Sequence, residues 1–399
     1  MDAEFPVHRK REFVGELQRT RTGGRFVYDP LWLSQADPKD RGVAWTLPPR
    51  EEAYETAHIP SLPTFFVNLL PEGEMLRRLT KRAGIAQSDL TRLLGILGED
   101  AIGDVTIQSA EPHGRTMRLP ADVPFREAYR RLLDDPSLPA PIGAIAGVQP
   151  KMSADRITLP FGVKAGPGAF LKFASDGRYK EAAHNEAFFM AMAVGCGLPT
   201  ARVEKVQDSA GEFALLVQRF DRRVFRGKPF GRLHQEDVLQ LLDLYPGDKY
   251  DVTVEEVGSA IRKVVGAWPP TAIDLILQFA FGYLIGNGDQ HAKNVGVLES
   301  SPGIWTLSPI YDMLSTLAHD GEQPLALTLN GRDEELTRTD FVALAQTFGI
   351  REAAVLRRLD LMLVKALPWL DRLGEIGFEP LVTERLGGAL RERHAALSG

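Results

Sequence analysis

The stretch 285-IGNGDQHAKNVGVL-298 interrupts an apolar part of the chain with a tight run of glycine and polar residues, and then resumes as VGVL. Asp289 and Asn294 stand within it in the pattern Asp-x4-Asn. In phosphoryl-transfer enzymes a loop of this spacing holds an aspartate that accepts the proton of the attacking hydroxyl and an asparagine that binds a metal ion. Both residue types are also common turn formers, so the pattern alone fits either a catalytic loop or an ordinary turn.

A second motif, 308-SPIYDMLS-315, follows after what reads as a β-hairpin and offers Asp312 as a further metal ligand. Mg²⁺ prefers oxygen ligands and usually takes only one or two carboxylates from the protein, so Asn294 and Asp312 would suffice. The order of a buried helix, a polar loop, a hairpin and a Tyr-Asp pair favours a catalytic loop over a simple turn.

Upstream residues could hold a nucleotide. Lys172, in AFLKF, lies between apolar neighbours and is predicted on a strand, facing away from Leu171 and Phe173. Kinases use a strand lysine of this kind on the α- and β-phosphates of ATP, and Glu186 on the next predicted helix is the expected ion-pair partner. The alternative for Lys172 is a solvent-facing strand residue.

Two further segments are candidates for nucleotide contact. The loop 146-AGVQPKMS-153 precedes a predicted strand, and its backbone N–H groups could meet phosphate oxygens, although its spacing is not that of a Walker A loop. In 215-LLVQRFDR-222 an apolar strand runs into Arg219 and Phe220, a candidate hinge that could bind an adenine edge through backbone groups. An ordinary loop would also explain the first segment.

Shifts in composition and periodicity divide the chain into three predicted units of an α+β protein. Residues 1–135 read as a small α/β domain, and the proline-rich stretch 132–143 is the linker candidate. Residues 136–230 read as a β-rich lobe that carries one helix. Residues 231–399 read as a mostly helical lobe.

Individual elements can also be predicted. In the first unit we expect strands at 13–17, 25–29 and 43–47, and a helical pattern over 65–84. The most apolar segment, 273–286, includes charged and amide side chains and is shorter than the ~20 residues that a membrane-spanning helix needs. It is predicted to be a buried core helix.

The composition narrows the class of protein. The net charge of −6 is spread without long single-sign blocks, which does not favour a protein that coats nucleic acid. Cys196 is the single cysteine, so no internal disulfide can form, and we expect it to pack as a small apolar residue. The N-terminus lacks the apolar run of a signal peptide. Together these features predict a cytoplasmic protein that does not enter a membrane.

These motifs resemble those of the HipA-like serine/threonine kinases, toxin components of bacterial toxin and antitoxin pairs. The resemblance covers most of the chain and follows the family's order. The matching segments are FFVNLLPEG at 65–73, AGVQPKMS at 146–153, HNEAFFMAMAVGCGLP at 184–199, QRFDRR at 218–223, RLHQEDVLQLL at 232–242 with KY at 249–250, GNGDQHAKN at 286–294 and SPIYDMLS at 308–315.

The resemblance implies a two-lobed, protein-kinase-like fold of the lipid-kinase type with an added N-terminal α/β subdomain and a helical C-terminal lobe. It implies ATP and Mg²⁺ as cofactors, Asp289 as the catalytic base, and Asn294 and Asp312 as metal ligands, with Glu186 supporting the lysine. The residues implied in ATP binding are Ala146, Gly147, Val148, Gln149, Pro150, Lys151, Lys172, Gln218, Arg219, Phe220, His291, Lys293 and Tyr311.

The resemblance also implies partners. The antitoxin of such a kinase is typically a small helix-turn-helix protein of the HipB kind, which makes most of the DNA contact. The best-known protein substrates in the family are aminoacyl-tRNA synthetases. One departure matters: self-inactivating members phosphorylate a serine just before the phosphate loop, and here 143-GAIAG-147 places Ala144 and Ala146 at those positions. Without a hydroxyl neither residue can accept phosphate.

Three other functions are consistent with parts of the sequence. A small-molecule phosphotransferase could share the Asp-x4-Asn loop and the later aspartate, but FFVNLLPEG and HQEDVLQ argue against it. A pseudokinase that acts as a co-repressor with a DNA-binding antitoxin is disfavoured because the lysine, base and metal ligands are all retained. Direct DNA binding by the helix, turn and helix at 341–359 competes with simple packing of a helical lobe.

Overall fold

The computed structural model describes residues 4–37, 42–56, 62–98, 101–108, 124–127, 156–161, 168–174, 181–225, 228–320 and 324–399. The predicted linker 132–143 and the predicted phosphate loop 146–151 lie outside these residues. In the described part of the chain, no helix combines the length and the apolar character needed to cross a membrane.

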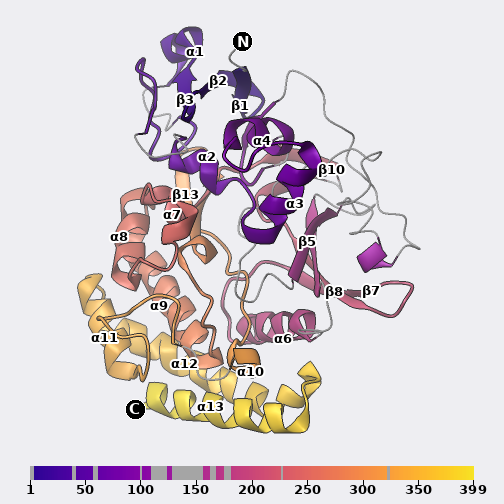
Figure 1. Ribbon diagram of the computed structural model, residues 1–399. Helices are drawn as coiled ribbons and strands as arrows, with labels where there is room; N and C mark the ends of the chain where they lie inside the picture. Colours follow the sequence, from indigo (N-terminus) through magenta and orange to yellow (C-terminus); the bar gives the residue numbers. More distant parts are fainter. Residues whose placement is uncertain are drawn as a thin grey trace.

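The N-terminal domain is built on an antiparallel sheet of order β3-β2-β1-β4 (Figure 1). The buried residues alternate along its strands, so one face packs against the domain's own hydrophobic core. This confirms the strands predicted at 13–17 and 25–29, whereas the first strand was not anticipated. The strands are β1 (Glu4–Arg9), β2 (Glu12–Thr20), β3 (Gly23–Tyr28) and β4 (Val105–Ile107).

Two predictions in this domain are wrong in detail. Residues 43–47 form no strand; Leu47 N–H bonds to Ala44 O at 3.1 Å in a tight turn, and the two prolines that follow cannot donate to a sheet. The helical pattern over 65–84 is divided in two because Pro71 lacks an N–H group and disfavours helix in the residue before it. The helices are α1 (Pro30–Gln35), α2 (Thr64–Asn68), α3 (Gly73–Ala83) and α4 (Leu90–Leu97).

The second antiparallel sheet, of order β5-β6-β8-β7, has α6 packed against it, to the right of Figure 1. A two-stranded hairpin, β9 with β10, follows it. The helix predicted to carry Glu186 is confirmed as α6, and Cys196 directly after it is buried. The elements are β5 (Arg156–Phe161), β6 (Ala169–Ala174), α6 (Ala182–Gly195), β7 (Val203–Gln207), β8 (Phe213–Gln218), β9 (Arg222–Phe225) and β10 (Lys228–Arg232).

The rest of the chain is mainly helical, with a small sheet of order β11-β12-β13 beside the helices. Its elements are β11 (Gln235–Asp237), α7 (Val238–Leu241), η3 (Pro246–Asp248), α8 (Val254–Val264), α9 (Trp268–Ile285), η4 (Ala292–Asn294), β12 (Gly296–Ser301), β13 (Ile304–Leu307), α10 (Leu317–Asp320), α11 (Arg338–Thr347), α12 (Glu352–Leu370), η5 (Leu373–Ile376) and α13 (Pro380–Ser398).

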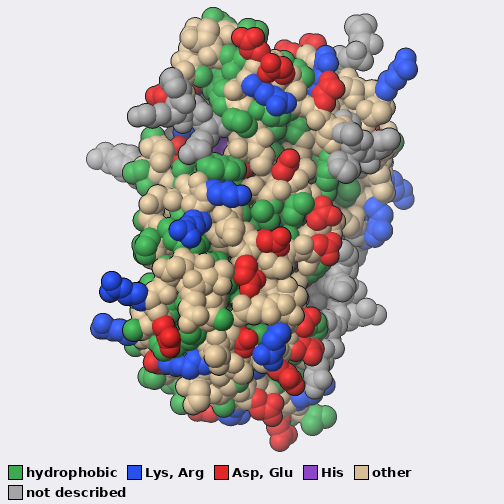
Figure 2. All heavy atoms as spheres, turned by 90° about the vertical axis from the view of Figure 1, so that its left-hand side faces the viewer, with side chains coloured by type: hydrophobic (Ala, Val, Ile, Leu, Met, Phe, Trp, Pro, Cys, Tyr) green, Lys and Arg blue, Asp and Glu red, His purple; other side chains and the backbone are tan. Residues whose placement is uncertain are grey.

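The segment 341–359, considered above for DNA binding, covers most of α11 and the first part of α12. Phe341, Leu344, Val355 and Leu359 are all buried in the main hydrophobic core. On the face of the molecule that includes α8 and α11, basic and acidic side chains are interspersed (Figure 2). Packing within the helical lobe is therefore sufficient to explain these two helices.

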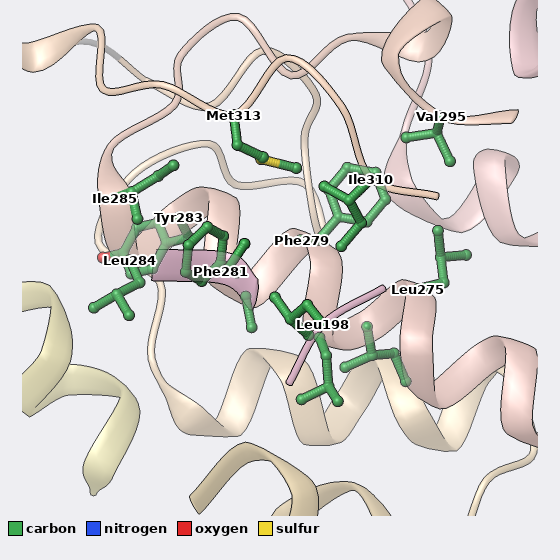
Figure 3. Close-up of a cluster of buried hydrophobic side chains, with 14 of the residues drawn as sticks. Leu198, Leu275, Phe279, Phe281, Tyr283, Leu284, Ile285, Val295, Ile310 and Met313 are labelled. Atoms are coloured by element: carbon green, nitrogen blue, oxygen red, sulfur yellow. The ribbon is translucent and has the colours of Figure 1, made fainter. Parts of the chain in front are cut away.

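The centre of the main core is α9, which the sequence predicts as a buried helix. Its two prolines lie in the first turn, where the missing N–H groups have no helical partner in any case. Leu275 and Phe279 of α9 lie in the same buried cluster as Val295, Ile310 and Met313 (Figure 3). The neighbours of the candidate site residues Asn294 and Asp312 are thus anchored in apolar packing.

Candidate active site

The polar loop begins where α9 ends. Gly286 has φ +66°, a left-handed conformation that suits glycine, and the N–H of Asn287 bonds back to Gly282 O at 2.9 Å. A Cβ on Gly286 would come within 2.2 Å of the Leu317 side chain. A larger residue here would be strained and would collide with α10. The glycine lets the chain turn sharply out of the buried helix into the loop.

Asn287 joins the two motifs that carry the candidate chemistry. Its Oδ1 accepts a hydrogen bond from the Asp289 N–H at 3.1 Å, and its Nδ2 donates to the Asp312 carbonyl at 3.2 Å. The side chain is fully buried. Sequence reasoning did not single out Asn287, although an asparagine two residues before an aspartate is a turn signal that could have drawn attention to it.

Asp289 is held from two sides. The Tyr250 hydroxyl donates to its Oδ1 at 2.8 Å, and Asn294 Nδ2 donates to its backbone carbonyl at 2.9 Å. Burial and the neighbouring Asp289 raise the pKa of Tyr250, so the phenol stays protonated and remains a donor. Tyr250 was noticed in the sequence as part of the KY pair but was given no role.

Asp312 and Asn294 present oxygen donors of the kind that a magnesium ion prefers. The Nδ2 group of Asn294 donates to the backbone carbonyl of Asp289, so the side-chain oxygen of Asn294 faces away from that carbonyl. Asp312 has φ +57°, which is uncommon for a residue with a side chain, and Met313 beside it is fully buried. The chemistry of these donors fits a divalent cation.

Lys172 lies on β6 and forms ion pairs with two carboxylates, those of Glu186 and Asp312. Its Nζ is 3.0 Å from Glu186 Oε1 on α6 and also forms an ion pair with Asp312. Glu186 is 1% exposed, so its charge is compensated inside the protein. Asn185, next to it, exchanges two hydrogen bonds with the backbone of Ser315. The predicted contact between Lys172 and Glu186 is present, and α6 is fastened to the segment that carries Asp312.

Three residues expected to line the ATP site support the loop from within. His291 is fully buried, and burial lowers its pKa well below the usual value, so the ring is neutral and its Nδ1 accepts from Lys293 N–H at 3.2 Å. The Lys293 ammonium group lies 2.7 Å from Glu72 of the N-terminal domain. The Tyr311 hydroxyl donates to the Lys293 carbonyl at 2.7 Å. ATP contact by these side chains stays a prediction, since all three have partners within the protein.

The candidate hinge lies at the end of β8. Gln218 N–H bonds to Arg202 O at 2.8 Å and Arg219 N–H to Gly168 O at 3.2 Å, while the Phe220 ring lies 5.7 Å from that of Tyr311. The Arg219 guanidinium is buried and turned toward the N-terminal domain, where it donates to Ala101 O at 2.9 Å. The Arg219 side chain is therefore structural, and an adenine contact here would involve backbone groups or Phe220.

The hinge also carries a buried ionic cluster. Asp221 accepts hydrogen bonds from Arg219, from Arg222 at 2.7 Å and from Gly103 N–H at 2.8 Å. Burial raises the pKa of Asp221, but the two arginines outweigh it and lower the pKa to about 2. The carboxylate stays ionised and connects the hinge to the N-terminal domain.

Two family models match this chain in consecutive regions. The HipA N-terminal domain matches residues 5–108, and the HipA-like C-terminal domain matches residues 143–369. The chain belongs to the HipA family. The C-terminal match contains every site residue predicted from the sequence, including Ala146 to Lys151 and Ala144, which lie outside the described residues.

Relatives of this HipA-family protein support the assignment. Two proteins of Sinorhizobium fredii carry the names "Putative kinase Y4dM" and "Putative kinase Y4mE". The first is 31% identical over 67% of this chain and 66% of its own length. The second is 30% identical over 87% of this chain and 86% of its own length.

A solved structure shares the fold of this HipA-family chain. It is the Shewanella oneidensis HipA in a complex of HipA, HipB and operator DNA. The TM-score is 0.73, the identity is 21%, and the superposition covers 98% of this chain and 97% of that one. At this identity the likeness establishes the HipA fold and no more.

Proposed function

We propose that this HipA-family protein is an ATP- and Mg²⁺-dependent serine/threonine protein kinase. In this proposal the nucleotide binds between the β-rich lobe 136–230 and the helical lobe 231–399. Residues 1–135 are the added subdomain. One observation carries the proposal. A hydrogen-bonded aspartate, Asp289, lies on the same loop as Asn294, and Asn287 connects that loop to Asp312, which pairs with the strand lysine Lys172. This is the set of groups that phosphoryl transfer from ATP requires.

Each residue has a role in the proposed reaction. Asp289 orients the acceptor hydroxyl and takes its proton as the oxygen attacks the γ-phosphorus; a new P–O bond forms, and the bond from the γ-phosphorus to the leaving oxygen of ADP breaks. Lys172, held by Glu186, binds the α- and β-phosphates. Gln218 to Phe220 and the loop from Ala146 to Lys151 are proposed to hold the adenine and the phosphates.

Asn294 and Asp312 would hold the magnesium ion, which supplies positive charge to the phosphate oxygens. Asn287 keeps the two ligands in register because it contacts the segments of both. Lys172 compensates the Asp312 charge in the structure. We propose that it turns toward the phosphates when nucleotide and metal bind.

We propose that the partner is a HipB-like helix-turn-helix antitoxin, which would provide most of the DNA contact. The Shewanella relative of similar fold occurs in such a complex. The proposed substrate is a hydroxyl of a cytoplasmic protein, with aminoacyl-tRNA synthetases as the first class to test. Ala144 and Ala146 carry no hydroxyl, so we expect no self-inactivation at these positions.

The test is transfer of label from γ-labelled ATP with Mg²⁺ into a bacterial lysate and into a panel of purified aminoacyl-tRNA synthetases. The wild type is compared with Asp289→Asn and with the control Asp371→Asn, an exposed aspartate directly after α12 of the same helical lobe. We expect a labelled protein band with the wild type and the control, and none with Asp289→Asn, although that variant still binds ATP.

Other outcomes would favour the competing functions. Label in the small-molecule fraction, dependent on Asp289, would favour a small-molecule phosphotransferase. ATP binding without transfer to any acceptor would favour a pseudokinase that acts as a co-repressor with its antitoxin. Wild-type turnover by Asp289→Asn would refute the role of Asp289 as the base.

A further inference from the structure

A partly buried carboxylate of the N-terminal domain bridges two lysines of the helical lobe. Glu72, at the start of α3, places Oε1 2.7 Å from Lys293 Nζ and pairs through Oε2 with Lys249 Nζ. The side chains of Lys249 and Lys293 are 5% and 2% exposed, and that of Glu72 is 13% exposed. Lys293 Nζ also donates to the Asn68 carbonyl at 3.4 Å. The bridge is therefore largely shielded from water.

Each of the two lysines precedes a residue that holds Asp289. Tyr250 follows Lys249 and donates to the Asp289 carboxylate, while Asn294 follows Lys293 and donates to the Asp289 carbonyl. The backbone joins the same two segments, because Ala292 N–H bonds to Lys249 O at 3.1 Å. The two lysines that pair with Glu72 are thus the sequence neighbours of Tyr250 and Asn294, whose side chains bond to the proposed base.

Electrostatics make the carboxylate necessary for this arrangement. Lys249 and Lys293 bring two like charges together in a site with little access to water, and like charges at short range repel strongly where screening is weak. A shared carboxylate between them compensates both. Without it the two ammonium groups would move apart or toward solvent, and Tyr250 and Asn294 would move with them.

The bridge is not needed to dock the N-terminal domain, because α2 makes other contacts with the helical lobe. Thr64 bonds to Asp243, Asn68 Nδ2 donates to Leu244 O at 2.9 Å, and Gln240 Nε2 donates to Phe65 O at 3.2 Å. These contacts lie along α2 and involve no buried lysine. They would hold the domain in place if the Glu72 charge were removed.

We propose that Glu72 is a positioning residue for phosphoryl transfer: the N-terminal domain sets the geometry of the catalytic loop through the Glu72 bridge to Lys249 and Lys293. This inference rests on the proposed kinase function and adds that the first domain is part of the catalytic unit. Contacts that shift α3 would then alter turnover without touching the nucleotide.

The test compares the wild type with Glu72→Gln, which keeps the shape and removes the charge. The matched control is Glu55→Gln in the same domain, an exposed carboxylate paired with Arg25. We expect Glu72→Gln to lower kcat about tenfold or more and to change KM for ATP less than twofold. Its melting temperature is expected to fall below that of the control, because the two buried ammonium groups lose their shared counter-charge. Amide hydrogen exchange in residues 287–295 is expected to become faster.

A second variant separates positioning from stability. Glu72→Gln combined with Lys249→Met removes one of the two repelling charges at a residue with no proposed nucleotide contact, so slower exchange in 287–295 and a higher kcat than in Glu72→Gln alone are expected. Wild-type kcat and wild-type exchange in Glu72→Gln would overturn the proposal. So would a parallel loss of kcat, ATP affinity and melting temperature with no rescue by the second change, which is the pattern of general destabilisation.

Failure of the kinase proposal would be distinguishable. If the wild type transfers no phosphate to any acceptor, the proposed function fails, but hydrogen exchange still reports on the bridge. Faster exchange in 287–295 with Glu72→Gln, and not with Glu55→Gln, would then keep Glu72 as the residue that orders this loop. Unchanged exchange would remove that role as well.

Discussion

The Tyr250 hydroxyl donates a 2.8 Å hydrogen bond to Oδ1 of Asp289, the proposed catalytic base. The phenol ring packs in an edge-to-face arrangement with buried His291, with ring centroids 5.3 Å apart. A carboxylate that must meet an acceptor hydroxyl at a defined angle benefits from such a fixed donor, since its rotation is restricted before the substrate arrives. Tyr250 is therefore expected to contribute to turnover more than to nucleotide binding.

Tyr250→Phe removes this donor and keeps the ring. Because a hydrogen bond to a charged group contributes about 1.5–3 kcal/mol, we expect kcat to fall roughly 10- to 100-fold, with ATP affinity unchanged by calorimetry. The control is Tyr245→Phe, whose hydroxyl bonds to Thr56 at 3.1 Å, away from Asp289. Equal kcat values for the two variants would show that the Tyr250 hydroxyl has no part in orienting the base.

Lys172→Met tests the other end of the candidate site. The change removes the ammonium group that pairs with Glu186 and Asp312, and keeps most of the side chain's volume. Loss of a charged contact to phosphate should weaken ATP binding about tenfold or more, measured by calorimetry in the presence of Mg²⁺. Lys205→Met, an exposed lysine on β7 of the same sheet, is the control. Unchanged affinity in Lys172→Met would exclude Lys172 from phosphate binding.

Short-range sequence patterns were sufficient to predict much of the fold. A continuous apolar run predicted α9, and strand alternation followed by a helix placed Lys172 near Glu186. These predictions succeed because each depends on the periodicity of one or two neighbouring elements. The failures at 43–47 and 65–84 are also local, since prolines overrode the apolar pattern.

The contacts that organise the site could not be predicted in the same way. Tyr250 and Asp289 are 39 positions apart, and Glu72 and Lys293 are 221 positions apart. Nothing in the spacing of residues fixes which side chains meet across such separations, because that depends on how the N-terminal domain docks on the helical lobe. The motifs identified the candidate reacting groups, while the structure supplied the residues that hold them.

Asn287→Ala tests whether the two motifs must be joined. The change removes the acceptor for Asp289 N–H and the donor to Asp312 O. We expect kcat to fall at least about tenfold and the Mg²⁺ concentration for half-maximal activity to rise, because Asp312 and the loop that carries Asp289 and Asn294 lose their common support. Gln346→Ala, which removes an exposed amide from α11, is the control. A variant with normal Mg²⁺ dependence would contradict the joining role.

A buried histidine connects the N-terminal domain to the helical part of the chain. His234 Nδ1 lies 2.7 Å from Asp104 Oδ1, and Nε2 lies 3.0 Å from Glu236 Oε1. Burial lowers the pKa of His234, but Asp104 and Glu236 outweigh it and raise the pKa to about 9. The ring is therefore an imidazolium at neutral pH and donates from both nitrogens.

The raised pKa of His234 predicts how stability depends on pH. A group whose pKa is raised on folding stabilises the folded state fully below its unfolded pKa, near 6.5, and this contribution is lost as the pH rises through about 9. We expect His234→Asn to cost about 3 kcal/mol more in free energy of unfolding at pH 6.5 than at pH 9.5, measured by urea denaturation. His394→Asn, which replaces a histidine of α13 bonded to Leu363 O, is the control. An equal cost of His234→Asn at both pH values would mean that the histidine is not charged in the folded protein, and that Asp104 and Glu236 meet a neutral ring.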